Sequence, residues 1–138
     1  MEGRARVPSD RSPRVAIVDD EPAFREALES LLGAFGIAAV GFETAEAFLA
    51  YGERGRLFCL LLDMQMPGLG GLALQERLVS EGESLPVIFI SSRDDAPSRD
   101  RAMAAGALAC LGKPFDRDAL LALLAEAQAR RPADPAQG

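Results

Sequence analysis

Residues 57–63 of the chain read Leu-Phe-Cys-Leu-Leu-Leu-Asp, an apolar run that ends at an acid. A strand with one face in water alternates apolar and polar side chains, whereas a strand covered on both faces is apolar throughout. Strands of the second kind occur mainly in parallel sheets with helices on both sides. The stretch therefore predicts a buried central strand of an α/β protein.

Other apolar runs, with helical patterns between them, extend this prediction along the chain. The expected strands cover residues 14–18, 38–42, 57–62, 86–90 and 107–111. The first helix is expected to begin at Pro22, since proline is favoured at the first helical position, and to end at Gly36. Thr44 and Asp116 are expected to cap the second and last helices. A weaker, alanine-rich helix is expected over residues 96–105. Five strands alternating with five helices predict a doubly wound α/β domain around a parallel sheet.

Length and composition predict one folded domain with short tails. The chain has 138 residues, of which 49% are hydrophobic, values that are ordinary for a single globular domain. Residues 1–13 combine arginine and proline without periodicity, and residues 131–138 consist of helix breakers and small residues. We therefore expect a disordered N-terminal tail, a domain over residues 14–130, and a C-terminal tail or the start of a linker to a further domain.

The residue types present exclude several kinds of chemistry. The chain has no histidine, which rules out a Ser-His-Asp triad and a Cys-His pair. Two cysteines, Cys59 and Cys110, cannot supply the usual four ligands of a structural zinc site. The net charge of −6 argues against a nucleic-acid surface on this domain. The sequence shows no membrane span and no signal peptide, and its unpaired thiols fit a reducing compartment, so we expect a cytoplasmic protein.

Polar residues follow four of the expected strands directly. In a sheet of this type the ligand site lies at the carboxyl ends of the strands, beside the point where the strand order reverses. The residues that we expect there are Asp19 and Asp20 after the first strand, Asp63 after the third, Ser91 and Ser92 after the fourth, and Lys113 with Pro114 after the fifth. Each has a simpler explanation alone, such as a helix cap, a turn residue or a solvated charge. Their convergence on one edge favours a common chemical role.

The physical chemistry of this group points to phosphoryl transfer. Carboxylates that lie close together repel unless a cation or a proton intervenes, and oxygen ligands favour a hard cation such as Mg²⁺. Asp63, alone at the end of a buried strand, is a candidate nucleophile that could attack phosphorus. Lys113, the only lysine of the chain, would supply positive charge, Ser91 would donate to a phosphoryl oxygen, and the small Ser92 would leave room for the donor.

Four motifs closely resemble the receiver domain of two-component response regulators, over roughly residues 14–128. They are Val-Asp-Asp-Glu at 18–21, Leu-Asp-Met-Gln-Met-Pro-Gly at 62–68, Val-Ile-Phe-Ile-Ser at 87–91, and Gly-Lys-Pro-Phe at 112–115. The stretch at 66–76 is most similar to receivers that precede a LuxR-type helix-turn-helix, as in FixJ-like regulators. The resemblance implies a flavodoxin-like, CheY-like (βα)5 fold with strand order 2-1-3-4-5.

The same resemblance implies a role for each site residue. Asp63 would accept a phosphoryl group from a histidine of a sensor kinase. Asp20, Asp63 and the backbone carbonyl of Met64 would hold Mg²⁺, with Asp19 acting through water. Ser91 and Lys113 would sense the phosphoryl group, and the Lys113–Pro114 peptide bond would be cis.

The resemblance also implies an output surface. This surface would be made by the fourth helix, the fifth strand and the fifth helix, and it would support a phosphorylation-dependent homodimer. The proline-containing tail hints at a downstream effector, for example a DNA-binding domain. The sequence does not identify the cognate kinase, the stimulus or the effector.

One position departs from the family pattern. Three residues before Lys113, where receivers normally carry an aromatic switch residue, this chain has Cys110. A thiol cannot swing a large apolar body between exposed and buried positions, so the usual coupling of Ser91 to the output surface is in question. Both Cys110 and Cys59 are consistent with small buried strand residues. Gln65 and Arg93 flank the site, and we expect them to tune dephosphorylation.

Three other functions are alternatives to a phosphoaccepting switch. A haloacid-dehalogenase-type phosphatase needs a second acid two residues after its nucleophile, where this chain has Gln65. A flavodoxin-like cofactor site needs a phosphate-cradling loop after the first strand, where this chain has acids that would repel phosphate. A receiver that acts as a phosphorylation-independent interaction module is the third alternative, since Cys110 replaces the switch aromatic.

Overall fold

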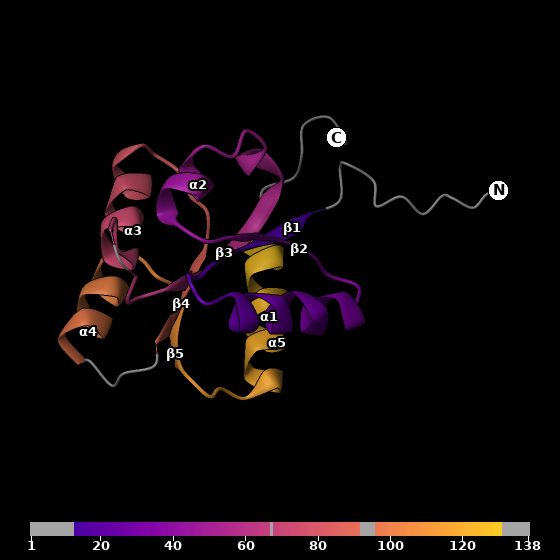
Figure 1. Ribbon diagram of the computed structural model, residues 1–138. Helices are drawn as coiled ribbons and strands as arrows, with labels where there is room; N and C mark the ends of the chain where they lie inside the picture. Colours follow the sequence, from indigo (N-terminus) through magenta and orange to yellow (C-terminus); the bar gives the residue numbers. More distant parts are fainter. Residues whose placement is uncertain (1–12, 67, 92–95, 131–138) are drawn as a thin grey trace.

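The structure is a computed structural model, and it describes residues 13–66, 68–91 and 96–130. Five strands form one parallel sheet in the order β2-β1-β3-β4-β5 (Figure 1). The strands are β1 (Arg14–Val18), β2 (Ala38–Phe42), β3 (Leu57–Asp63), β4 (Val87–Ser91) and β5 (Ala109–Gly112). The fold class and the strand order predicted from the sequence are therefore confirmed.

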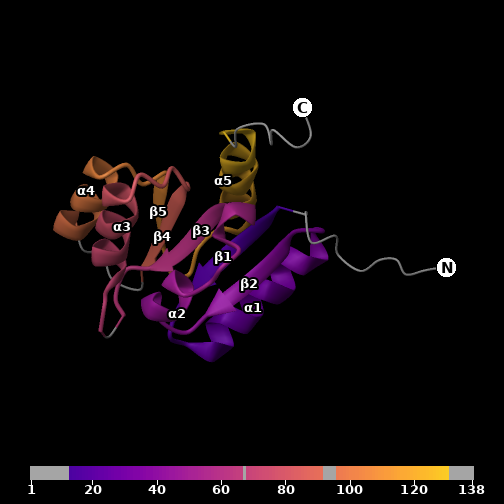
Figure 2. The ribbon, with the colours of Figure 1, turned by 90° about the horizontal axis from the view of Figure 1, so that it is seen from above.

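Four α-helices connect the strands, a fifth follows β5, and together they cover both faces of the sheet (Figure 2). They are α1 (Pro22–Ala34), α2 (Ala45–Leu49), α3 (Gly71–Ser80), α4 (Ala96–Ala104) and α5 (Arg117–Arg130). Helices α1 and α5 pack on one face, and α2, α3 and α4 on the other, so the buried apolar residues form two separate clusters. The central strand β3 contributes to both clusters, and every one of its seven residues is buried.

Local signals explain where the first helices begin and end. Pro22 is the first residue of α1, and Gly36, just beyond the end of that helix, has a φ of +77°, which favours glycine. Thr44 caps α2, because its side-chain oxygen accepts a hydrogen bond from the Ala47 N–H at 3.0 Å. These predicted boundaries are confirmed.

A few boundaries differ from the expected ones. The fifth strand begins at Ala109 rather than at residue 107. The Ala107 N–H donates to the Ala102 carbonyl, so residue 107 still completes the C-terminal turn of α4 and cannot begin the strand. A short 3₁₀ helix, Arg54–Arg56, was not predicted. The expected N-terminal tail up to residue 12 and the expected tail after residue 130 lie outside the described residues.

Helices α3 and α4 are joined by a buried polar side chain. Gln75 of α3 is 2% exposed, and its Nε2 donates to the carbonyl oxygen of Ala102 in α4 at 3.0 Å. This carbonyl lies in the last turn of α4 and also accepts from the Ala107 N–H, so it has two donors. Gln75 therefore ties the C-terminal end of α4 to α3. Across the described ranges, no helix is both long and apolar enough to cross a membrane.

Candidate phosphoryl-acceptor site

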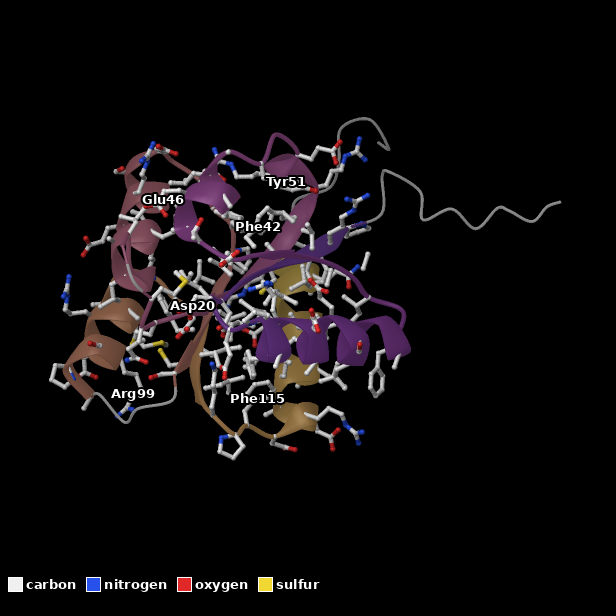
Figure 3. The ribbon with its side chains drawn as sticks, in the orientation of Figure 1. Asp20, Phe42, Glu46, Tyr51, Arg99 and Phe115 are labelled. Carbon is white, nitrogen blue, oxygen red and sulfur yellow. The ribbon has the colours of Figure 1, made fainter. Side chains whose placement is uncertain are left out.

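Three carboxylates meet where β1 and β3 end. Asp19 and Asp20 follow β1, and Asp63 is the last residue of β3. Each offers a carboxylate oxygen, and these oxygens lie within 4.8 Å of one another. Asp19 and Asp63 are buried, whereas Asp20 is exposed. Figure 3 shows Asp20 and Phe115 near the first turn of α1. The arrangement provides an oxygen-rich site that combines buried and exposed carboxylates.

The carboxyl group of Asp63 has an unusual affinity for protons. Its pKa is raised in total from the ordinary value of 3.8 to about 6, and the largest cause is burial, because a charged carboxylate loses hydration inside the protein. The backbone N–H of Gln65, which donates to Asp63 Oδ1 at 3.1 Å, lowers this pKa. Repulsion from Asp19 and Asp20 raises it further, and attraction from Lys113 lowers it. The proton affinity of Asp63 therefore arises mainly from its burial, with the neighbouring acids adding to the effect and Lys113 opposing it.

Asp19 is held through all of its polar groups. Its Oδ1 accepts from the backbone N–H of Glu21 at 2.9 Å, and its Oδ2 accepts from Lys113 Nζ at 3.1 Å. Its own N–H donates to the Phe42 carbonyl at 3.1 Å, which continues the pairing of β1 with β2. Its carbonyl oxygen accepts from Nη1 of Arg25 in α1 at 2.6 Å. The position of this acid is therefore set by groups from β2, from α1 and from the segment after β5.

Lys113 points toward the acids of the first loop. Besides Asp19, its ammonium lies 3.7 Å from Glu21 Oε1 and 3.9 Å from the ring centroid of Phe24. Its backbone N–H donates to the Ser91 carbonyl at 2.7 Å, which continues the pairing of β4 with β5. The Lys113–Pro114 peptide bond is cis, as expected. Lys113 attracts the Asp63 carboxylate electrostatically and so lowers its pKa. Its direct ion pairs are made with Asp19 and Glu21.

Ser91 and Gln65 connect the ends of β4 and β3. The hydroxyl of Ser91 donates to Gln65 Oε1 at 3.0 Å. The adjacent Met64 is buried, and its N–H donates to the Ile90 carbonyl at 3.0 Å, which prolongs the pairing of β3 with β4 beyond Asp63. Both predicted residues, Ser91 and Gln65, thus lie at the same edge of the sheet as Asp63.

A glycine permits the close approach of α3 to the site. Gly71 begins α3, and a Cβ atom there would lie 2.5 Å from the carbonyl oxygen of Asp63 and 3.2 Å from the Phe89 ring. The first of these neighbours is backbone and cannot rotate away. Any larger residue at position 71 would therefore push α3 away from the end of β3.

The two cysteines lie within the sheet. Cys59 of β3 is fully buried, and burial raises the pKa of its thiol to about 12. Cys110 of β5 pairs with Phe89 of β4, is half-buried, and packs against the cluster under α2, α3 and α4. Burial also raises the pKa of the Cys110 thiol, although Arg99 opposes the shift. A raised pKa keeps a thiol in its less reactive, protonated form.

Two predicted residues cannot be placed, and two others were missed. Ser92 and Arg93 lie outside the described residues. Arg25 and Phe24 contact the site but were not predicted there. Phe24 follows the N-cap residue Glu21 by three positions, a spacing that could have indicated that both side chains lie near the acidic loop.

The chain belongs to the response regulator receiver domain family, whose pattern matches residues 15–125. Residues 15–125 are therefore a receiver domain of the kind found in two-component response regulators, a signalling phosphoacceptor domain, which implies a cognate sensor kinase. This membership removes the dehalogenase-type phosphatase and the flavodoxin-like cofactor site as alternatives.

Named relatives agree with the predicted resemblance to FixJ-like regulators. The chain is 41% identical over 113 residues to the response regulator protein TodT of Pseudomonas putida, covering 82% of this chain and 50% of TodT. It is 34% identical to the transcriptional regulatory protein FixJ of Bradyrhizobium diazoefficiens, covering 88% of this chain and 58% of FixJ. The crystal structure of FixJ-N superposes with a TM-score of 0.81 at 31% identity, covering 89% of this chain and 98% of that one. The chain spans about half the length of the curated relatives it matches.

Proposed function

We propose that Asp63 accepts a phosphoryl group from a phosphohistidine of the cognate sensor kinase. The observation that carries this assignment is the position of Asp63, a buried carboxylate at the end of the central strand within 4.8 Å of two other acids. A carboxylate oxygen of Asp63 forms a bond to phosphorus while the phosphorus–nitrogen bond to the histidine breaks. The electron pair leaves with the imidazole nitrogen, which takes a proton from water.

The donor set of the acidic group fits a magnesium ion. All three side chains offer oxygen, and the pKa of Asp63 is raised mainly by burial and additionally by repulsion from Asp19 and Asp20, a repulsion that a divalent cation would offset. Asp20, Asp63 and the backbone carbonyl of Met64 would hold the ion, and Asp19 would act through water. When bound, the ion supplies positive charge next to the phosphoryl oxygens.

Ser91 and Lys113 complete the proposed site by donating to the transferred group. Both have other partners in this structure, Gln65 for Ser91 and the acids Asp19 and Glu21 for Lys113. We propose that these partners are exchanged for phosphoryl oxygens when Asp63 is phosphorylated. Pro114 would support the site by shaping the loop after Lys113, while Ser92, expected from the sequence to support it as well, lies outside the described residues.

A matched pair of substitutions tests the acceptor assignment. With a small phosphodonor such as acetyl phosphate, we expect the intact mass to increase by one phosphoryl group, and only when magnesium is present. Asp63→Asn should abolish this gain. Asp118→Asn removes an exposed carboxylate in the first turn of α5 and should leave it unchanged. Undiminished labelling of Asp63→Asn would place the acceptor elsewhere.

The wider role of the protein is proposed from the same resemblance. We propose that residues 14–130 form the receiver domain, flanked by tails, and that the protein acts in the cytoplasm in transcription regulation. Its domain would contact neither nucleic acid nor membrane directly, and phosphorylation would promote a homodimer through α4, β5 and α5. The relatives named as transcriptional regulators support this output.

Cys110 favours a second candidate, an interaction module that works without the phosphorylation switch. Its half-buried thiol stands where the family carries the switch aromatic, and it offers no bulky side chain to move. Measuring the oligomeric state with and without beryllofluoride, a phosphoryl mimic, separates the two candidates. A shift from monomer to dimer supports the switch, and an unchanged state supports the constitutive module.

A further inference from the structure

The ammonium group of Lys113 lies between two acids and one aromatic ring. Asp19 Oδ2 is 3.1 Å away, Glu21 Oε1 is 3.7 Å away, and the centroid of the Phe24 ring is 3.9 Å away. The lysine side chain is only 17% exposed. The aromatic contact is therefore made by a cation with little access to water, the situation in which cation–π attraction is strongest.

The ring of Phe24 is fixed in place from two sides. Phe24 lies in the first turn of α1, whose start is set by Pro22. Its ring meets the ring of Phe115 edge to face, with centroids 6.1 Å apart and planes at 88°. Phe115 comes two residues after Lys113, so the segment that carries the lysine also orients the ring that the lysine contacts.

The contact with Glu21 would not by itself determine where the lysine side chain lies. Glu21 is 63% exposed, and a carboxylate on a flexible, solvated side chain attracts an ammonium group over a broad range of positions. The face of an aromatic ring attracts a cation only above its plane. Phe24 therefore adds a directional contact that Glu21 cannot supply.

We propose that Phe24 is a positioning residue for Lys113, holding the ammonium beside Asp19 so that it is already near the phosphoryl site when transfer begins. This inference rests on the proposed role of Lys113 as a donor to the phosphoryl group. It assigns to the first turn of α1 a part in phosphoryl transfer, exerted through the lysine and without contact to the reacting atoms.

The presence of a single lysine allows a direct test of position. Selective labelling with ε-¹³C-lysine gives one lysine signal in the full chain, and a proton above a ring face resonates upfield of its usual position. We expect an upfield ε-methylene signal in the wild-type protein and in Phe24→Tyr, which keeps a ring. In Phe24→Leu the signal should return toward that of a solvated lysine. Phe35→Leu is the matched control, because Phe35 follows α1 at its far end and its ring contacts Arg117 instead.

Phosphorylation kinetics then test the function of the contact. With acetyl phosphate and magnesium, Phe24→Leu should accept phosphate roughly three- to tenfold more slowly, the range expected for loss of a cation–π contact. Phe24→Tyr should restore the rate, and Phe35→Leu should not change it. Backbone amide spectra of each variant check that the fold is retained.

The possible failures of this inference differ from those of the proposed function. An unshifted lysine signal in the wild-type protein, or the same shift in Phe24→Leu, would overturn the contact whether or not Asp63 is phosphorylated. A lysine signal that moves in Phe24→Leu without any change in rate would overturn the positioning role. Absence of phosphorylation in the wild-type protein would contradict the acceptor assignment instead, and with it the role of Lys113 on which the positioning rests.

Discussion

The hydroxyl of Ser91, at the end of β4, donates a hydrogen bond to the side-chain carbonyl of Gln65, two residues beyond Asp63, with 3.0 Å between the oxygens. A serine hydroxyl has one proton to donate. Ser91 must therefore give up Gln65 before it can donate to a phosphoryl group on Asp63. On the proposed role of Ser91, Gln65 therefore competes with the phosphoryl group for the same donor.

Replacing Gln65 with alanine should lengthen the lifetime of the phosphorylated protein. The substitution removes the competing acceptor and a polar side chain that could orient water near Asp63. A hydrogen bond of this kind is worth about 0.5–1.5 kcal/mol, so we expect the half-life to increase roughly two- to tenfold. Phosphate release after removal of the donor measures it. Gln128→Ala, on the exposed side of α5, is the control, and an unchanged half-life in Gln65→Ala would contradict the competition.

Gly71→Ala should lower the free energy of unfolding by about 1–3 kcal/mol, because its Cβ would lie 2.5 Å from the Asp63 carbonyl oxygen. Gly33→Ala is a matched control inside α1, where a Cβ meets nothing within 4 Å. Helix propensity predicts a gain of about 0.5–1 kcal/mol for that change. Urea denaturation of both variants compares the two effects. An equal change in the free energy of unfolding for Gly71→Ala and Gly33→Ala would contradict this prediction, because it would show that α3 accommodates the added Cβ without loss of stability.

Stability without metal should depend on the charge of Asp63. Its pKa is about 6 in the folded protein and ordinarily 3.8, so the folded state binds more protons between these values, and stability falls as pH rises through this interval. Asp63→Asn lacks this loss. The free energy of unfolding of Asp63→Asn minus that of the wild-type protein should therefore depend on pH. This difference should be larger at pH 7 than at pH 4 by about 1–3 kcal/mol.

Denaturation in chelator-containing buffers at several pH values measures this difference. Asp118→Asn should follow the wild-type curve, because Asp118 is exposed and far along the chain from the acidic group. Magnesium should reduce the difference at pH 7, since a bound cation offsets the repulsion among the acids. A pH-independent difference between Asp63→Asn and the wild-type protein would contradict the raised pKa.

Arg25→Met should destabilise the loop that carries Asp19. The substitution keeps most of the apolar stem and removes the donor to the Asp19 carbonyl, which accepts at 2.6 Å. Hydrogen bonds from charged groups contribute about 1.5–3 kcal/mol, and we expect the free energy of unfolding to fall by that amount. Arg77→Met on the exposed side of α3 should change it by less than about 0.5 kcal/mol. Thermal or urea unfolding that shows the same small effect for both would rule out the role of Arg25.

The edge of the sheet at which the site lies could be predicted from the sequence, because strand ends follow directly from apolar runs and parallel strands end together. Asp63 illustrates this, since it follows six apolar residues without interruption. The partners of Lys113 could not be predicted, because they depend on how α1 lies against the sheet. The position of α1 against the sheet also brings Phe24 and Arg25 to the acidic loop. The spacing of residues within β1 or β5 does not predict this position of α1.

The late start of β5 has a similar explanation. Ala107 is compatible with either a strand or the end of a helix, and its N–H bonds to Ala102 only because α4 ends there. Local sequence does not decide between these two partners, since the choice depends on the length of the preceding helix.

The complete burial of β3 also limits how this domain can diverge. Each residue from Leu57 to Asp63 packs against a layer of helices or lies in the acidic group, so a polar replacement anywhere in the strand would meet a wall of apolar atoms or other acids. Every residue of the edge strand β2 is only half-buried. Descendants of this sequence can therefore accumulate neutral substitutions along β2, while both the amino-acid sequence and the structure of β3 stay nearly unchanged.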